Sequence, residues 1–188
     1  LSSGNLIEGN RIGTDPAGTV DEGNTYVGVW IDGASVAAQD NTVRANLISG
    51  NGNYGVYIDG ALASNNALEA NYIGVDVTGS AFLSNNAEGV GIYDASYNRI
   101  GGTSLSQRNI ISANYSDGIW IAGSAAGNLV QGNLIGTDAW GQTGLPNIGV
   151  GILVEASNNT IGESGWKAPA RGAGEGGPSC APPCNLVS

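Results

Sequence analysis

The chain has 188 residues, 41% of them hydrophobic, and 16 acidic against 6 basic residues give it a formal net charge of −10. This length and apolar content suffice for one sizeable core and argue against a disordered chain. The negative charge repels phosphate backbones, so nucleic acid is not expected as a partner. No apolar run is long enough to span a bilayer, and we expect no membrane insertion.

A repeat runs through the whole chain. The segment GNLIEGNRIGTD begins at Gly4, a near copy, GNLVQGNLIGTD, begins at Gly127, and a more divergent copy, NNALEANYIGVD, begins between them at Asn65. A shorter motif, G-[VI]-x-I, recurs about twice as often and begins at Gly28, Gly55, Gly89, Gly118 and Gly149. Such a period indicates a solenoid of stacked turns, in which a turn with a short corner alternates with one that has a long corner.

Each turn contains three short segments in which apolar residues alternate with others between Asn or Gly borders, as is typical of strands. In the first segment we expect one inward column to consist of Val29, Val56, Val90, Ile119 and Val150. In the second segment the inward residues are Val43, Leu68, Ile100, Val130 and Ile161. In the third segment they are Ile12, Ile48, Ile73, Ile111 and Ile135. The pattern predicts an all-β tube with three strands per turn and about five to six turns.

Asparagine recurs at the corners between these segments. Turns stacked at strand spacing, about 4.8 Å, place equivalent residues above one another. Asparagine tolerates left-handed backbone and closes turns, and stacked asparagine side chains can form a hydrogen-bonded ladder. The sequence therefore predicts a structural ladder of Asn41, Asn66, Asn98, Asn128 and Asn159.

Three stretches, N-x-I-G-T-D-x-x-G, GVGIYDASYNRIGGT from Gly89 and RNIISAN from Arg108, together resemble the right-handed parallel β-helix repeats of large secreted bacterial proteins. Those proteins belong to the pectate-lyase-like superfold. The resemblance implies one single-stranded right-handed parallel β-helix over residues 1–188, in an extracellular or cell-surface location. The superfold includes polysaccharide lyases, glycoside hydrolases, tailspikes, adhesins and surface fibres, so the fold does not choose among these functions.

Two regions interrupt the regular pattern. Residues 162–184 form a Gly- and Pro-rich insertion that contains the only cysteines, Cys180 and Cys184. A disulfide between them is the expected pairing, because two cysteines without further Cys or His make a poor metal site. No capping segment is visible at either end of the repeat, and bare strand edges invite pairing. We therefore expect further β-helix turns or other protomers at the open ends.

The outward positions of the first strand suggest a ligand-binding surface. One outward column reads Trp30, Tyr57, Gly91, Trp120 and Gly151, and the next reads Asp32, Asp59, Tyr93, Ala122 and Leu153. Aromatic faces beside carboxylates suit sugars, which combine apolar faces with hydroxyl groups. The alternative is structural, since aromatic residues also favour strands. The ligand-binding candidates are Trp30, Asp32, Tyr57, Asp59, Tyr93 and Trp120.

The same surface allows an enzymatic alternative. Asp32 and Asp59 should lie one turn apart, roughly 5 Å, which suits the carboxyl pair of a retaining glycosidase, with Asp94 as a third carboxylate. However, the chain has no His, its arginines fall on other strands or corners, and the hydrolase motifs Asn-Thr-Asp and Asp-Asp are missing. We therefore assign no catalytic residue and favour a non-enzymatic structural or adhesive solenoid that binds a polysaccharide or cell-surface glycan. A polysaccharide lyase or glycoside hydrolase is the alternative.

A D-x-x-G element recurs on the long corner, at Asp15, Asp76 and Asp138. Calcium needs six to eight oxygen ligands, and aspartates two turns apart, roughly 10 Å, cannot share one ion. An aspartate that opens a β-turn explains all three copies. No cofactor is required, and these three residues are the weak candidates for calcium.

Overall fold

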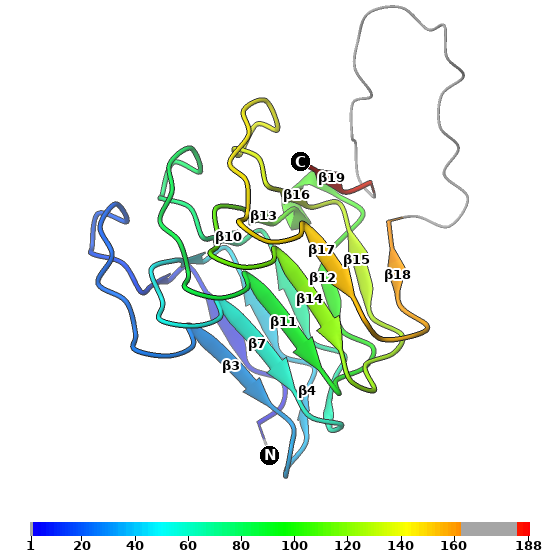
Figure 1. Cartoon of the computed structure of the whole chain (residues 1–188). Helices are drawn as coiled ribbons and strands as arrows, with labels where there is room; N and C mark the ends of the chain where they lie inside the picture. The colour runs from blue at the N-terminus through cyan, green and yellow to red at the C-terminus, as the bar shows by residue number, and fades with distance from the viewer. Residues whose placement is uncertain (1, 163–183) are drawn as a thin grey trace, which may run out of the picture.

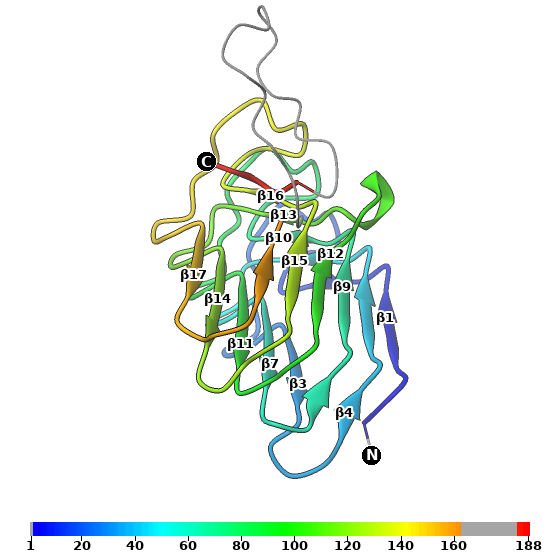
Figure 2. The ribbon, with the colours of Figure 1, turned by 90° about the vertical axis from the view of Figure 1, so that its right-hand side faces the viewer.

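The structure is a computed structural model that describes residues 2–162 and 184–188, and it shows a tube of parallel sheets (Figure 1). The first sheet consists of β3 (Val29–Asp32), β7 (Val56–Asp59), β11 (Val90–Tyr93), β14 (Ile119–Ala122) and β17 (Ile152–Val154). The second sheet, seen in Figure 2, consists of β1 (Leu6–Glu8), β5 (Thr42–Arg44), β9 (Ala67–Glu69), β12 (Arg99–Gly101), β15 (Leu129–Gln131) and β18 (Thr160–Ile161). The third sheet consists of β2 (Arg11–Ile12), β6 (Leu47–Ile48), β10 (Tyr72–Ile73), β13 (Ile110–Ile111), β16 (Leu134–Ile135) and β19 (Leu186–Val187).

Every strand in these sheets pairs in parallel with its equivalent in at least one adjacent turn. A short fourth pair, β4 (Ala38–Gln39) with β8 (Ala63–Ser64), forms at the corner between the first and second sheets, and a 3-10 turn, η1, spans Leu105–Gln107. The predicted fold, a parallel β-helix with three short strands per turn, is confirmed.

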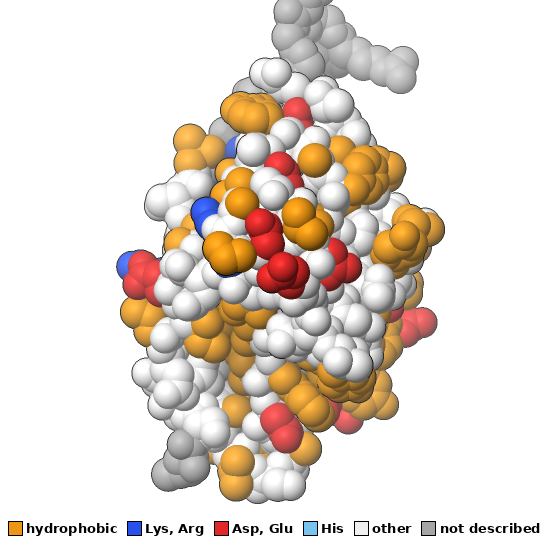
Figure 3. Space-filling view, turned by 90° about the vertical axis from the view of Figure 1, so that its left-hand side faces the viewer, with side chains coloured by type: hydrophobic (Ala, Val, Ile, Leu, Met, Phe, Trp, Pro, Cys, Tyr) orange, Lys and Arg blue, Asp and Glu red, His pale blue; other side chains and the backbone are white. Residues whose placement is uncertain are grey.

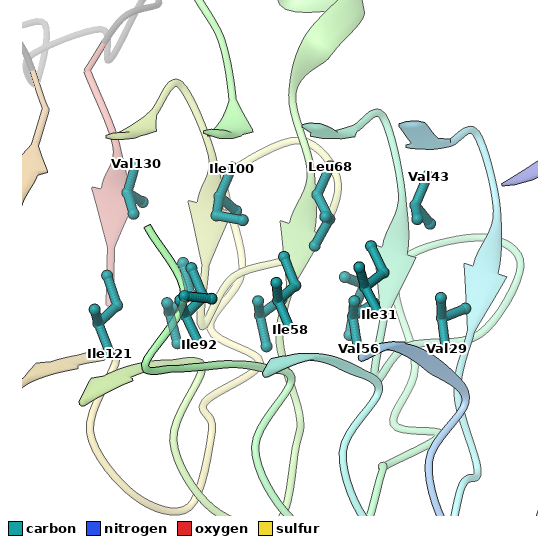
Figure 4. Packing of buried hydrophobic residues seen from close by; sticks show 14 of the residues in the cluster. Val29, Ile31, Val43, Val56, Ile58, Leu68, Ile92, Ile100, Ile121 and Val130 are labelled. Atoms are coloured by element: carbon teal, nitrogen blue, oxygen red, sulfur yellow. The ribbon is translucent and has the colours of Figure 1, made fainter. Parts of the chain in front are cut away.

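The core consists of the inward columns of all three sheets. Val56 pairs with Val29 on one side and Val90 on the other, and Leu68 likewise lies between Val43 and Ile100. These aliphatic side chains face one another across the interior (Figure 4), and most of them are completely buried. Burying one such side chain contributes roughly 1.5–3 kcal/mol, so stability depends on each turn being covered by its neighbours.

The sequence-based register is wrong in the last turn of the first sheet. Ile152, rather than Val150, pairs with Ile119, and Val150 is 51% exposed. The sequence GVGILV offers two matches to the strand pattern that differ by two residues. A shift of two keeps every side chain on the same face, so alternation alone cannot choose between them.

Asparagine forms three continuous ladders, one at each corner of the tube. In most rungs the backbone N–H and Nδ2 of one asparagine both donate to Oδ1 of the asparagine one turn further along, and Nδ2 commonly also donates to a backbone carbonyl. In the rungs from Asn24 to Asn51 and from Asn85 to Asn114, Nδ2 alone makes the bond to Oδ1. Asn46 and Asn71 illustrate this, with donor–acceptor distances of 3.1 Å for both bonds. The first ladder joins Asn5, Asn41, Asn66, Asn98, Asn128 and Asn159. The second joins Asn10, Asn46, Asn71, Asn109, Asn133 and Asn185. The third joins Asn24, Asn51, Asn85, Asn114 and Asn147.

The left-handed backbone at these corners does not belong to the ladder asparagines, contrary to the sequence-based expectation. It belongs in most rungs to the residue just before the asparagine: Asp40 (φ 57°), Ala45 (φ 53°), Asn65 (φ 57°) and Ala70 (φ 55°) are examples. The ladder asparagine needs its side chain aligned with the tube axis, and its predecessor makes the bend.

Ala45→Gly is therefore expected to stabilise the protein. Alanine at positive φ costs about 1–2 kcal/mol, and part of the gain is offset by the greater freedom of glycine in the unfolded chain. We expect a net increase of about 0.5–1 kcal/mol in the free energy of unfolding, measured by urea denaturation. Ala34→Gly, at an exposed residue without positive φ, serves as the control and should be neutral or destabilising. Equal effects of the two substitutions would contradict the assignment of strain.

The outward face of the third sheet is covered by the long corners. These corners project from the tube as three loops (Figure 1), and adjacent loops are joined by hydrogen bonds from Val77 to Gly18 and from Ala139 to Gly79, both 2.9 Å. Beneath them lies a second apolar cluster of Val75, Ile110, Ala113, Leu134 and Leu145. The loops therefore seal one side of the solenoid.

The end of the tube formed by β1, β2 and β3 exposes apolar surface. Hydrophobic side chains are visible beside carboxylates in the view onto this end (Figure 3). Leu6 is 58% exposed, and a groove of about 540 Å³ lies between Leu6, Trp30 and Val36. A covering of this end by further turns or by another protomer stays a prediction.

Candidate functional site

The outward face of the first sheet differs from those of the other two. The third sheet is covered by its loops, and the second sheet carries ion pairs between Arg44 and Glu8 and between Arg99 and Glu69. The first sheet instead exposes aromatic rings and carboxylates. The residues predicted to bind a ligand lie on this face, because outward positions of successive parallel strands superimpose.

Six rings form an aromatic strip along the axis of the tube: Tyr26, Trp30, Tyr54, Tyr57, Tyr93 and Trp120. The ring centroids of Trp30 and Tyr57 lie 6.1 Å apart, and Tyr26 contacts Trp30 edge-on at 6.2 Å. At the other end of the strip, Tyr93 and Trp120 stack with centroids 5.8 Å apart. Trp30 is half exposed, so the strip presents ring surface to solvent.

Tyr54 fills the gap that the sequence predicts at Gly91. Its ring stacks on Tyr57 at 4.5 Å and 13° from parallel, and a Cβ on Gly91 would lie 2.8 Å from the Tyr54 ring. Glycine at this position therefore leaves room for the Tyr54 ring beside Tyr57. Sequence reasoning missed Tyr54 and Tyr26 because it considered strand residues alone. The signal was their shared placement at the corner just before the G-V strand.

Carboxylates flank the aromatic strip. Asp32 and Asp59 are direct partners on β3 and β7, and Tyr93 occupies the equivalent position on β11. Asp94 follows Tyr93 in left-handed backbone (φ 55°), and its Oδ1 accepts hydrogen bonds from the backbone N–H and hydroxyl of Ser124 at 2.7 and 2.9 Å. The structure thus places these three acidic residues on adjacent turns of one face.

Burial and neighbouring negative charges shift the pKa values of acidic and tyrosine side chains on this face. Partial burial, with the charges of Asp32 and Asp94, raises the pKa of Asp59 above its ordinary value. Burial and the carboxylate of Asp59 raise the pKa of Tyr57 to about 12, so its hydroxyl keeps its proton and can donate a hydrogen bond. Burial raises the pKa of Tyr54 as well. The outward face of the first sheet is therefore rich in carboxylates and partly shielded from solvent.

The last rung of the face differs from the sequence-based expectation. Leu153, not Gly151, pairs with Trp120, because the strand is shifted by two residues. The shift brings Glu155 near Trp120, whose indole Nε1 donates to Oε2 of Glu155 at 2.9 Å. The strip therefore ends in a fixed Trp120 ring beside a further carboxylate.

The D-x-x-G aspartates close their own loops. Backbone N–H groups of Thr19 and Val20 donate to Oδ1 of Asp15 at 2.7 and 2.8 Å and lower its pKa. The pKa of Asp138 is lowered in the same way, chiefly by the backbone N–H of Gln142. Burial raises the pKa of Asp76, but hydrogen bonds from Thr78 and the following backbone outweigh it and lower the pKa.

These carboxylates are therefore surrounded by donors, whereas a calcium site needs further oxygen ligands. Within residues 2–162 and 184–188, no group of three or more His, Cys, Asp or Glu side chains is placed to hold a metal ion. The predicted disulfide involves Cys180, which lies outside the described residues, so the pairing with Cys184 stays a prediction.

Comparison with known proteins identifies the family. Residues 1–164 match the family model of a right handed beta helix region. The chain belongs to the right-handed β-helix family. No curated protein and no solved structure gives a significant match to the chain. In the described part of this β-helix protein, no helix is long and apolar enough to cross a membrane.

Proposed function

We propose that this β-helix protein is a non-enzymatic structural or adhesive solenoid that binds glycans through the aromatic strip of its first sheet. The observation that carries the proposal is the strip itself, in which two groups of contacting rings lie beside carboxylates on a face that no described loop covers. The apolar faces of sugar rings can pack on the aromatic rings, while Asp32, Asp59 and Asp94 can accept hydrogen bonds from sugar hydroxyls.

The geometry of the strip is fixed before any ligand arrives. Tyr54 stacks on Tyr57, and Trp120 is held by its hydrogen bond to Glu155. Rings that are already ordered lose less entropy on binding, which favours affinity. Because the strip crosses β3, β7, β11 and β14, a glycan chain would lie along the axis of the tube and contact several turns. We place this binding outside the cell or at its surface, as the resemblance to secreted β-helix proteins implies.

Substitution of the strip tryptophans tests the proposal. Trp30→Ala and Trp120→Ala are each expected to weaken binding on a glycan array by about tenfold or more, the equivalent of roughly 1.4 kcal/mol of lost stacking. Trp140→Ala provides the matched control, because Trp140 is 64% exposed but lies on a long corner away from the first sheet. Unchanged array binding in both strip variants, or an equal loss in the control, would refute the proposal.

One observation supports the enzymatic alternative. Burial, with the charges of Asp32 and Asp94, raises the pKa of Asp59, and a pair of neighbouring carboxyl groups in different environments is the arrangement that glycoside hydrolysis uses. Incubation with the glycans that bind, followed by an assay for new reducing ends, decides between the two functions. Product that disappears in Asp59→Asn, with binding retained, would assign hydrolysis to this face.

A further inference from the structure

The charged residues are distributed unevenly around the tube. In the described part of the chain, the arginines lie on the second and third sheets or at their corners: Arg11 on β2, Arg44 on β5, Arg99 on β12 and Arg108 before β13. The sequence holds only two other basic residues, Lys167 and Arg171, and both fall outside the described residues. The first sheet, in contrast, carries carboxylates and no described basic side chain.

These carboxylates are adjacent to the ring surface. Asp32 lies two residues from Trp30 on β3, and Asp59 lies two residues from Tyr57 on β7. Both aspartates therefore point outward on the same face as the rings. Glu155 contacts the last ring of the strip through its hydrogen bond to Trp120. A ligand that packs on the rings comes within a few ångströms of several negative charges.

We infer that the aromatic strip selects uncharged glycans and rejects acidic ones, and that Asp32, Asp59 and Asp94 determine this specificity. The inference rests on the proposed function and goes beyond it by naming the class of glycan. Sugar hydroxyls can donate hydrogen bonds to the carboxylates, whereas the carboxylate of a uronic acid cannot donate and is repelled. No described basic group on this face offsets the repulsion.

The raised pKa of Asp59 agrees with this inference. Its carboxylate already experiences the negative charges of Asp32 and Asp94 in a partly buried position. A negatively charged ligand would add to the electrostatic repulsion among these carboxylates. Salt screens this repulsion less where the groups are partly buried. Sugar hydroxyls can donate hydrogen bonds to the same carboxylates without adding negative charge. The strip therefore favours a ligand that carries hydrogen-bond donors and no negatively charged group.

The experiment compares matched ligands. Hexasaccharides of glucose, mannose and galactose are tested by isothermal titration at low salt, each beside its uronate counterpart with the same linkage. We expect at least one neutral hexasaccharide to bind, and its uronate form to bind at least tenfold more weakly. In the triple variant Asp32→Asn, Asp59→Asn, Asp94→Asn the difference should fall below threefold.

The substitutions preserve the local structure. Asp94→Asn adds no strain in the left-handed backbone at this position, because asparagine tolerates positive φ. An amide Oδ1 can still accept from Ser124 there and, at position 32, from the backbone N–H of Ala34. A control triple, Asp21→Asn, Glu22→Gln and Asp40→Asn, removes the same formal charge away from the strands of the first sheet. It should leave the preference for the neutral ligand unchanged, within about twofold.

The outcomes separate this inference from the proposed function. Uronate binding that equals or exceeds neutral binding, while Trp30→Ala still weakens it, would overturn the charge selectivity alone. A preference that persists in the first-sheet triple, or disappears equally in the control triple, would overturn the role of Asp32, Asp59 and Asp94. If no hexasaccharide binds, neutral or acidic, both the proposed function and this inference fail.

Discussion

Asn71→Ala is expected to lower the free energy of unfolding by roughly 3–6 kcal/mol, enough to unfold a marginally stable protein. The Asn71 side chain accepts from the backbone N–H and Nδ2 of Asn46 and donates to the carbonyl of Val43 and to Oδ1 of Asn109, at 2.8–3.1 Å. Alanine removes all four bonds and leaves these partners short of a bond in a buried corner, at a cost of about 1–3 kcal/mol for each group that stays unsatisfied. Chemical denaturation followed by circular dichroism measures the effect.

Asn86→Ala is the matched control for this substitution. Asn86 is exposed and follows the ladder residue Asn85, but no described residue bonds to its side chain. Its replacement should change the free energy of unfolding by less than about 0.5 kcal/mol, as is usual at the surface. Similar losses for Asn71 and Asn86 would mean that the ladder contributes little beyond local turn formation.

Gly101→Ala should have a comparable effect for a different reason. Gly101 has φ 82°, and a Cβ on it would overlap the carbonyl oxygen of Gln131 and the side chain of Asn133 in the next turn. Left-handed alanine costs about 1–2 kcal/mol, and forcing atoms into a packed site adds about 1–3 kcal/mol. The total expected loss is about 2–5 kcal/mol in the free energy of unfolding, measured by thermal and urea denaturation.

Gly162 offers an internal comparison for the contribution of stacking. It directly follows β18, the equivalent strand of the last turn, with nearly the same backbone, φ 86°, but no described atom lies within 4 Å of its virtual Cβ. Gly162→Ala should therefore show only the backbone cost of about 1–2 kcal/mol. The difference between the two variants isolates the close approach of successive turns, and a difference near zero would contradict that approach.

The core could be predicted from sequence because its determinants are local and repeated. Val56 and Ile58 alternate with Tyr57, and the same alternation recurs at a regular period, so the inward columns follow from periodicity. The registers of Leu68 with Ile100 and of Ile73 with Ile111 agree with the predicted columns. The register of the last strand of the first sheet was predicted wrongly. A two-residue shift leaves the alternation of side chains unchanged and alters only the length of the corner before the strand.

Other features depend on three-dimensional contacts that no single strand encodes. The ladder through Asn51 and Asn85 was not expected, because the corners between the third and first sheets vary in length. The sealing of the third sheet by its loops depends on Val75 and Leu145, which lie outside the repeating strand motifs. On the candidate face, the outward placement of Trp30 and Trp120 followed from alternation, whereas Tyr54 reaches the strip from a corner.

The most direct test of the account is the register between successive turns, measured by NMR cross-strand NOEs in uniformly labelled protein. Vertical superposition predicts parallel-strand contacts from Trp30 to Tyr57, from Tyr57 to Gly91, from Gly91 to Trp120, and from Trp120 to Leu153. NOEs of antiparallel pairing, or contacts that join Trp120 to Gly151 as its direct partner, would contradict it.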